Sequence, residues 1–312
     1  MKRALAAGAA ALVFGLCADA GGPSNAPAAG CPAPALDPVP AGERLPALPG
    51  MRIGLALGSG AIHGLAHIGV IEALEARGVP VKVVAGTSVG ALVGSLWASG
   101  MDGRDIEALA RTIDFEHLGA FVPSWQGLLR NDDLRERLEV ALGARPIQAW
   151  PRRFGAVAAN LDNGARRVLD SGDGAVAVQA STAMPVYFAP VKVDGERLGD
   201  GALVEPVPVR TARELGADYV IAVDVAYRPY EAPASGLLQN GFQAMHILVN
   251  ALAATEMRGA DFPIRIDAHH TMVECGNQAL IAEGRVAVAR QWPQLRRSLI
   301  AAHAGTSPVT RR

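Results

Sequence analysis

A serine flanked by glycines is the first feature of the chain that could carry out chemistry. The segment Gly86–Gly90 (GTSVG) fits the pattern G-x-S-x-G, and it lies between an apolar run, 81–85, and a small-residue segment, 89–98. The run predicts a buried strand and the segment predicts a buried helix. Ser88 would then occupy a tight strand-to-helix turn that exposes its Oγ, because glycines on both sides permit close backbone packing. A glycine-rich turn with an incidental serine is the other interpretation of so short a pattern.

A second glycine-rich turn follows the first predicted strand, 51–57. In the segment 57–64 (LGSGAIHG), successive backbone N–H groups could face an anion. A dinucleotide site is disfavoured because the third glycine, Gly64, comes one position late, and because the second strand ends without a carboxylate for a ribose. We therefore favour an oxyanion hole that acts with Ser88, since both turns would lie at the carboxyl ends of neighbouring strands.

An aspartate lies further along the chain, in the segment 197–209 (RLGDGALVEPVPV). On its own, the step from Asp200 to Gly201 indicates an ordinary turn. The two prolines within 202–209 exclude a regular central strand. We therefore expect Asp200 on an irregular loop that reaches the surface, which is a place suited to a catalytic carboxylate.

The segments between these loops alternate between strand and helix patterns. Further strands are predicted at 154–159, 167–170, 219–225 and 264–266, and helices at 65–77, 106–113, 134–142, 211–215, 236–257, 276–290 and 292–303. Continuous apolar strands separated by helices predict an α/β fold in which helices cover both faces of a mostly parallel central sheet.

The first fifty residues differ in composition from the rest. Residues 1–20 have a positive start, an apolar stretch and an A-x-A site, which is typical of a secretory signal, although an uncleaved anchor is the alternative. Residues 21–50 are rich in proline and alanine and predict a linker, so that 51–312 would form the folded domain. We expect an exported protein of the periplasm or cell envelope, with lipidation at Cys17 or Cys31 left open.

The overall composition excludes several classes of protein. The chain has 312 residues, of which 50% are hydrophobic and 19% charged, and its formal net charge is −1. A disordered chain would combine low hydrophobicity with high net charge. A protein that binds nucleic acid through phosphate contacts would be strongly basic. The composition therefore predicts a globular domain with no nucleic-acid partner.

Taken together and in this order, four blocks of the sequence resemble the patatin-like phospholipases. They are the glycine-rich turn with the residues up to Ile71, the GTSVG segment, residues 180–191 (ASTAMPVYFAPV) and the DGA segment 200–202. The resemblance runs from about residue 51 to residue 225. It implies a three-layer patatin-like fold and a serine acyl hydrolase that acts on phospholipids or lysophospholipids.

The resemblance also implies a role for each matching residue. Ser88 matches the nucleophile and Asp200 its general base, so that a Ser-Asp dyad replaces a triad. The glycine-rich turn matches the oxyanion hole, formed by Gly58, Gly60 and Ala61, with Gly64, Gly86, Gly90 and Gly201 as supporting motif residues. No metal or cofactor is implied, and contact with a membrane surface would be transient.

The chain departs from the family pattern at a few positions. His63 stands where the family usually has Arg or Lys, and a neutral imidazole would supply less positive potential to an oxyanion or phosphate. Ser59 and Ala61 stand where many members have glycine, and Glu205-Pro206 replaces two asparagines.

Two alternative functions stay open at this stage. A Ser-His-Asp hydrolase would need a late histidine, for which His269-His270 is the best candidate and His246 and His303 are others. A catalytically silent, lipid-binding envelope protein on the same fold is the second alternative. The distances from Ser88 Oγ to Asp200 and to the histidines distinguish the two catalytic arrangements.

Overall fold

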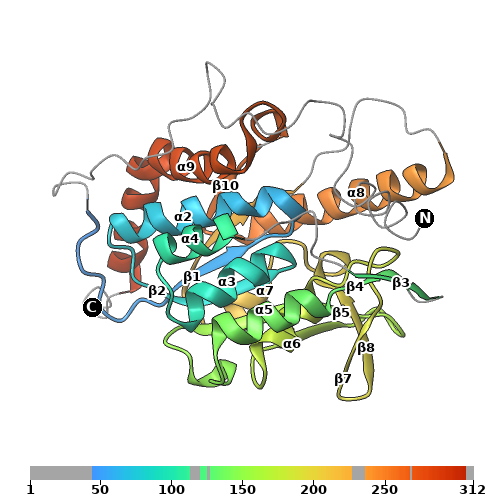
Figure 1. The fold of residues 1–312 in the computed structure, drawn as a ribbon. Helices are drawn as coiled ribbons and strands as arrows, with labels where there is room; N and C mark the ends of the chain where they lie inside the picture. Colours follow the sequence, from blue (N-terminus) through green and yellow to red (C-terminus); the bar gives the residue numbers. More distant parts are fainter. Residues whose placement is uncertain (1–43, 113–119, 125–126, 227–235, 268, 307–312) are drawn as a thin grey trace.

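The computed structural model describes residues 44–112, 120–124, 127–226, 236–267 and 269–306 (Figure 1). At its centre is an eight-stranded sheet in which hydrogen-bonded neighbours follow one another as β10-β9-β1-β2-β5-β8-β7. The strands β2 and β8 pair with successive parts of one edge of β5, and β6 pairs with its other edge. These strands are β1 (Ile53–Leu57), β2 (Val81–Thr87), β5 (Arg153–Asn160), β6 (Arg166–Leu169), β7 (Val191–Val193), β8 (Glu196–Asp200), β9 (Tyr219–Asp224) and β10 (Phe262–Arg265). The pairs from β10 to β5 are parallel, and β6, β7 and β8 pair antiparallel. The predicted α/β fold with a mostly parallel sheet is confirmed.

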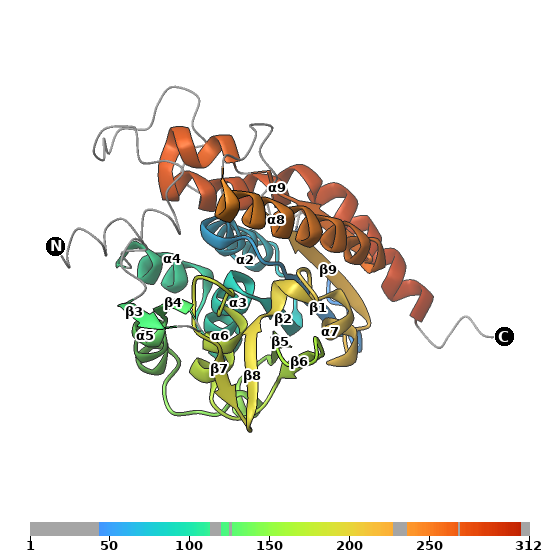
Figure 2. The ribbon, with the colours of Figure 1, turned by 90° about the vertical axis from the view of Figure 1, so that its right-hand side faces the viewer.

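Helices cover both faces of this sheet (Figure 2). They are α2 (Leu65–Ala76), α3 (Val89–Ser99), α4 (Gly103–Thr112), α5 (Asp132–Leu142), α6 (Gly174–Ser181), α7 (Val209–Glu214), α8 (Leu237–Glu256) and α9 (His269–Thr306). Successive strand residues face opposite sides. Leu55 therefore packs in the core shared with α2, α3 and α9, whereas its neighbour Ala56 packs in the core shared with α7 and the end of α8. The result is the predicted three-layer arrangement.

The hairpin of β7 and β8 was not among the predicted strands. Its two-residue turn is Asp194-Gly195, and both residues have positive φ, 50° and 83°. An Asp-Gly step in this conformation is the favoured two-residue connection of a hairpin. The short flanking strands contain Lys192, Glu196 and Arg197, which hide the apolar alternation. A separate antiparallel pair, β3 (Ala120–Ser124) and β4 (Gly127–Arg130), was also not predicted.

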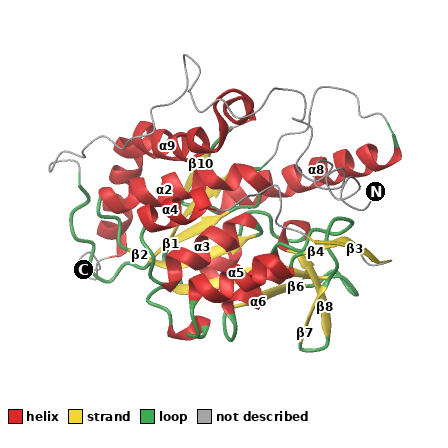
Figure 3. Cartoon of the chain, in the orientation of Figure 1, coloured by secondary structure: helices red, strands yellow, loops and turns green. Residues whose placement is uncertain are grey.

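The carboxyl-terminal elements differ in extent from the prediction. We expected two helices separated near Gln291, but α9 continues through Pro293 (Figure 3). Trp292 and Leu295 are buried on either side of this proline, so core packing outweighs the lost backbone hydrogen bond. The strand β10 begins at Phe262 and includes Pro263, which is tolerated because β10 is at the edge of the sheet.

The folded body begins before residue 51. Leu48 is buried in the main core, and Leu45 N–H donates to the carbonyl of Arg77 at 2.8 Å. The boundary predicted at residue 51 is therefore several residues late. The predicted signal segment, Cys17 and Cys31 lie outside the described residues. Within the described ranges, no helix has the length and apolar character needed to cross a bilayer.

Candidate active site

The turn between β2 and α3 gives Ser88 an unusual backbone. Its φ is 56° and its ψ is −124°, a combination that costs a non-glycine residue on the order of 1–3 kcal/mol. The flanking glycines make this turn possible, because a Cβ at Gly90 would lie 2.1 Å from the carbonyl oxygen of Leu57. A Cβ at Gly86 would lie 2.4 Å from Cα of Ala91. The strand-to-helix turn predicted around Ser88 is therefore present, with the strained serine backbone of a nucleophile elbow.

Two strands that end on the same edge of β5 bring Ser88 and Asp200 together. Thr87, the last residue of β2, pairs with Val157, and Asp200, the last residue of β8, pairs with the next residue, Ala158. Because β6 pairs with both of these β5 residues on the opposite edge, β2 and β8 must share one edge. The strand β2 runs parallel to β5 and β8 runs antiparallel, so their carboxyl ends meet. Ser88 follows Thr87 directly and therefore faces Asp200.

The two side chains form a short hydrogen bond. Ser88 Oγ donates to Asp200 Oδ2 at 2.7 Å, and Asp200 Oδ1 accepts from the N–H of Ala202 at 2.8 Å. Asp200 is only 1% exposed, and burial raises the pKa of its carboxyl. The hydrogen bonds from the Ala202 N–H and the Ser88 hydroxyl oppose this increase, and the resulting pKa is about 6. Such a carboxylate is a stronger base than one in water, and it lies within the reach that proton transfer needs.

The structure corrects the predicted surroundings of Asp200. We expected a loop that reaches the surface, but Asp200 is the buried last residue of β8. The two prolines that excluded a strand follow it, in the segment that leads to α7. Gly201 begins a short 3-10 helix, Gly201–Leu203, and a Cβ at this glycine would lie 2.2 Å from the carbonyl oxygen of Val157.

The glycine-rich turn after β1 has some of its backbone groups bonded and others available. Gly58 N–H donates to the carbonyl of Val223 at 2.9 Å, and Ser59 N–H donates to that of Pro206 at 2.8 Å. Gly58 was predicted as part of the oxyanion hole, but its bonded N–H makes it a poor donor to substrate. For Gly60 and Ala61, no bond from the N–H to a described residue is found. These two amides at the start of the 3-10 helix Ala61–Gly64 are the ones that can receive an oxyanion.

Comparison with known proteins identifies the family of the chain. The sequence pattern described as patatin-like phospholipase matches residues 55–213, which are about half of the chain. The chain belongs to the patatin-like phospholipase family. An uncharacterized NTE family protein of Mycobacterium tuberculosis is 35% identical over 190 residues, which are 60% of this chain and 53% of that protein. A protein named lysophospholipase NTE1 from Pyricularia oryzae is 29% identical over 217 residues, 66% of this chain and 14% of that protein.

The solved structure of VipD from Legionella pneumophila shares the fold of this patatin-like chain. The TM-score is 0.53 at 16% sequence identity, and the match covers 78% of this chain and 67% of the VipD chain. The chain spans about half the length of the mycobacterial relative and a much smaller part of the fungal one. These matches support the predicted fold class and family.

A buried histidine supports the glycine-rich turn of the patatin-like domain. His67 in α2 is 0% exposed, and its Nε2 lies 2.8 Å from the carbonyl oxygen of Gly58, to which it donates. Burial lowers the pKa of His67 to about 4, so the ring is neutral. His63, the departure from the family's basic residue, is 2% exposed in the short helix after the turn. Its ring is therefore part of the packed turn and does not form a solvent-facing binding surface.

The remaining motif positions are places of close packing. A Cβ at Gly64 would lie 2.2 Å from Cγ2 of Val89, so this glycine allows the oxyanion turn to pack on the residue that follows the nucleophile. Ala61 has a φ of 48° in the left-handed region, which favours glycine and accounts for the glycine found there in many members of the family.

Glu205 is a structural residue of the site for which the sequence pattern predicted no role. Its carboxylate accepts hydrogen bonds from Thr211 N–H at 2.9 Å and Thr211 Oγ1 at 2.6 Å, and it pairs with Arg166 at 3.1 Å. Its own carbonyl accepts from Thr87 Oγ1 at 2.7 Å. The next residue, Pro206, accepts the Ser59 N–H described above. The segment after Asp200 therefore joins β2 to the glycine-rich turn after β1, and the only sequence signal was the departure at Glu205.

In the part of the chain that the structure describes, Ser88 Oγ bonds to Asp200 and to none of the candidate histidines. His303 Nε2 contacts the carbonyl of Pro49 at 3.0 Å, and His246 lies half-buried in α8. The side chains of His269 and His270, the best candidates for a triad, lie outside what the structure describes. The hydrogen bond of Ser88 Oγ goes to Asp200. In the described part of the chain, no group of three or more His, Cys, Asp or Glu residues is placed to hold a metal ion.

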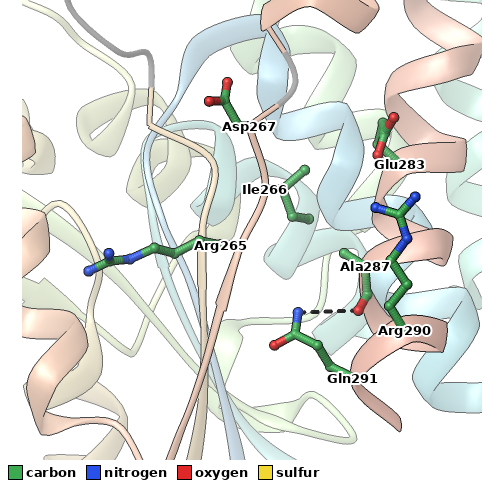
Figure 4. Close-up of a pocket in the computed structure, with 7 residues that line it drawn as sticks. All are labelled: Arg265, Ile266, Asp267, Glu283, Ala287, Arg290 and Gln291. Atoms are coloured by element: carbon green, nitrogen blue, oxygen red, sulfur yellow. Dashed lines mark hydrogen bonds between the residues drawn. The ribbon is translucent and has the colours of Figure 1, made fainter.

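A cavity of about 290 Å³ lies between the end of β10 and α9, and neither Ser88 nor Asp200 lines it (Figure 4). Its lining includes Arg265, Asp267, Glu283 and Arg290. The Arg265 side chain points away from the α9 side chains, so the two arginines do not converge on a common anion position. The residues that line this cavity do not include those described around Ser88.

Proposed function

We propose that this patatin-like domain is a serine acyl hydrolase that cleaves fatty-acyl ester bonds of phospholipids or lysophospholipids through Ser88 and Asp200. The observation that carries the proposal is the 2.7 Å hydrogen bond from Ser88 Oγ to the buried Asp200 carboxylate. Family membership and the relative named lysophospholipase support a lipid acyl ester as the substrate.

The mechanism begins with proton transfer from Ser88 Oγ to Asp200 Oδ2 as the serine oxygen attacks the ester carbonyl carbon. The resulting oxyanion receives the N–H groups of Gly60 and Ala61, and one such donor contributes roughly 2.7–4 kcal/mol. The intermediate then collapses, Asp200 returns the proton to the leaving alcohol, and an acyl-serine remains. Water attacks this ester while Asp200 takes its proton, and the fatty acid leaves as Ser88 recovers its hydrogen.

Direct measurement of fatty-acid release tests the proposed function. Purified protein is incubated with diacyl phospholipid vesicles and with lysophospholipid micelles, and the products are identified by mass spectrometry. A fluorophosphonate probe should label the tryptic peptide that contains Ser88, and Ser88→Ala should remove the label. If neither lipid releases fatty acid and the probe does not label Ser88, the proposed function is wrong, and the alternative is a catalytically silent lipid-binding protein.

The rate of hydrolysis should depend on pH through Asp200. The carboxyl must be ionised to accept the serine proton, and burial raises its pKa to about 6. We therefore expect kcat/KM to be level above this value and to fall about tenfold per pH unit below it. A pH profile measured with a short-chain p-nitrophenyl ester checks this result. Glu256, whose burial raises its pKa to about 8, is the control, because Glu256→Gln should leave the limb near pH 6 in place.

A further inference from the structure

The last residue of α6, Ser181, touches the backbone of the proposed nucleophile. Its Oγ accepts the N–H of Ser88 at 2.9 Å and donates to the carbonyl of Val157 at 2.5 Å. Ser181 is completely buried. A hydroxyl has one proton to donate, and here that proton goes to β5, so that a lone pair remains for the Ser88 amide. The side chain therefore links the central strand β5 to the Ser88 turn.

This contact acts on the strained part of the turn. Ser88 precedes α3, and its N–H has no partner within that helix. A backbone in a sparsely populated conformation persists only where its surroundings hold it there. We propose that Ser181 is a positioning residue that holds Ser88 in the conformation from which Oγ meets Asp200. The inference deepens the proposed function and rests on it for its effect on catalysis.

The same end of α6 also holds the other member of the dyad. Asp200 N–H donates to the carbonyl of Ala183 at 2.9 Å, two residues after Ser181. The end of α6 is itself held by Asn131, the residue before α5, because Asn131 Nδ2 donates to the carbonyl of Gln179 at 3.1 Å. Asn131 is 3% exposed. Segment 181–183 is thus a common support for Ser88 and Asp200, and it belongs to a sequence block to which no role had been assigned.

Ser181→Ala tests this role, with Ser95→Ala as the matched control. Ser95 is also a buried serine, but its Oγ donates to the carbonyl of Leu92 within its own helix. We expect Ser181→Ala to lower kcat about tenfold with little change in KM, since the net value of one hydrogen bond corresponds to about that factor. Ser95→Ala should retain the wild-type kcat. Ser181→Thr, which keeps the hydroxyl, should recover most of the rate.

Amide hydrogen exchange at Ser88 provides a measurement that does not need turnover. The amide resonance of Ser88 is assigned by its loss in Ser88→Ala. The exchange rate of this amide hydrogen is then compared in the wild type, in Ser181→Ala and in Ser95→Ala. We expect faster exchange in Ser181→Ala than in the wild type or in Ser95→Ala. Equal exchange and equal kcat in Ser181→Ala and Ser95→Ala would overturn the inference. If the wild type hydrolyses no ester, the proposed function fails, while the exchange rates still decide whether Ser181 holds the turn.

Discussion

Asp200→Asn is expected to lower kcat about 10³- to 10⁴-fold while making the folded protein more stable at pH 8. The loss follows because an amide cannot take the Ser88 proton, and replacement of the aspartate in Ser-His-Asp sites has effects of about this size. Asparagine keeps the size of the side chain and can still accept the N–H of Ala202. The measurements are the single-turnover rate of ester cleavage and the free energy of unfolding in urea.

Asp200→Asn should raise the free energy of unfolding, whereas an ordinary core substitution lowers it. Burial raises the pKa of Asp200 to about 6, so the folded state binds this proton more tightly than the unfolded chain does. The ionised carboxylate therefore reduces stability above pH 6, and this penalty disappears as the pH falls toward the ordinary value near 4. At pH 8 the neutral amide should add up to about 3 kcal/mol to the free energy of unfolding.

Asp224→Asn is the matched control for this substitution. Asp224 is also 1% exposed, ends a strand, and accepts the N–H of the residue two positions later, Ala226, at 2.9 Å. Its substitution should leave the rate within about threefold of wild type, since isosteric changes away from the reacting atoms have small effects. If Asp200→Asn retains more than a tenth of the wild-type rate, Asp200 is not the base, and the undescribed His269 and His270 become the next residues to replace.

The sequence was sufficient to predict the tight turn at Ser88 and the glycine-rich turn after β1 because their signals are local. Each lies where an apolar strand ends and a helix begins, and the glycines mark positions where a Cβ would meet backbone atoms, as at Gly90 and Gly64. The same local patterns gave the parallel strands and most helices. The pattern around Asp200 indicated only a place suited to a catalytic carboxylate, and the role of general base came from the resemblance to a family.

What the sequence could not supply is the pairing between distant segments. The meeting of β2 and β8 on one edge of β5 depends on a register between residues more than forty positions apart, and no local pattern encodes it. This register buries Asp200, where the sequence predicted exposure. The contacts of Glu205 with Thr87 and of Ser181 with Ser88 also join segments that are distant in sequence, so no local pattern reveals them.

In the proposed mechanism the oxyanion is received by Gly60 and Ala61, whose N–H groups are not among the bonded ones of the turn, and this makes Gly60 the most informative glycine to replace. A Cβ at Gly60 would lie 2.5 Å from the carbonyl oxygen of Val225 and 2.8 Å from its Cγ2. Since real Cβ atoms do not approach backbone oxygen so closely, the turn must move away from Val225, the residue after β9, in Gly60→Ala. The displacement would carry the N–H groups of Gly60 and Ala61 off the position of the oxyanion.

We expect Gly60→Ala to lower kcat and kcat/KM together by about 10²-fold, because the affected contacts strengthen only in the transition state. Gly241→Ala is the control, since Gly241 lies on α8 with open space around a Cβ, and alanine there should leave the rate unchanged. Steady-state kinetics and the melting temperature of both variants separate lost catalysis from lost folding. A folded Gly60→Ala protein with the wild-type kcat would show that the oxyanion is received elsewhere, and the N–H of Val89 at the start of α3 would then be the group to examine.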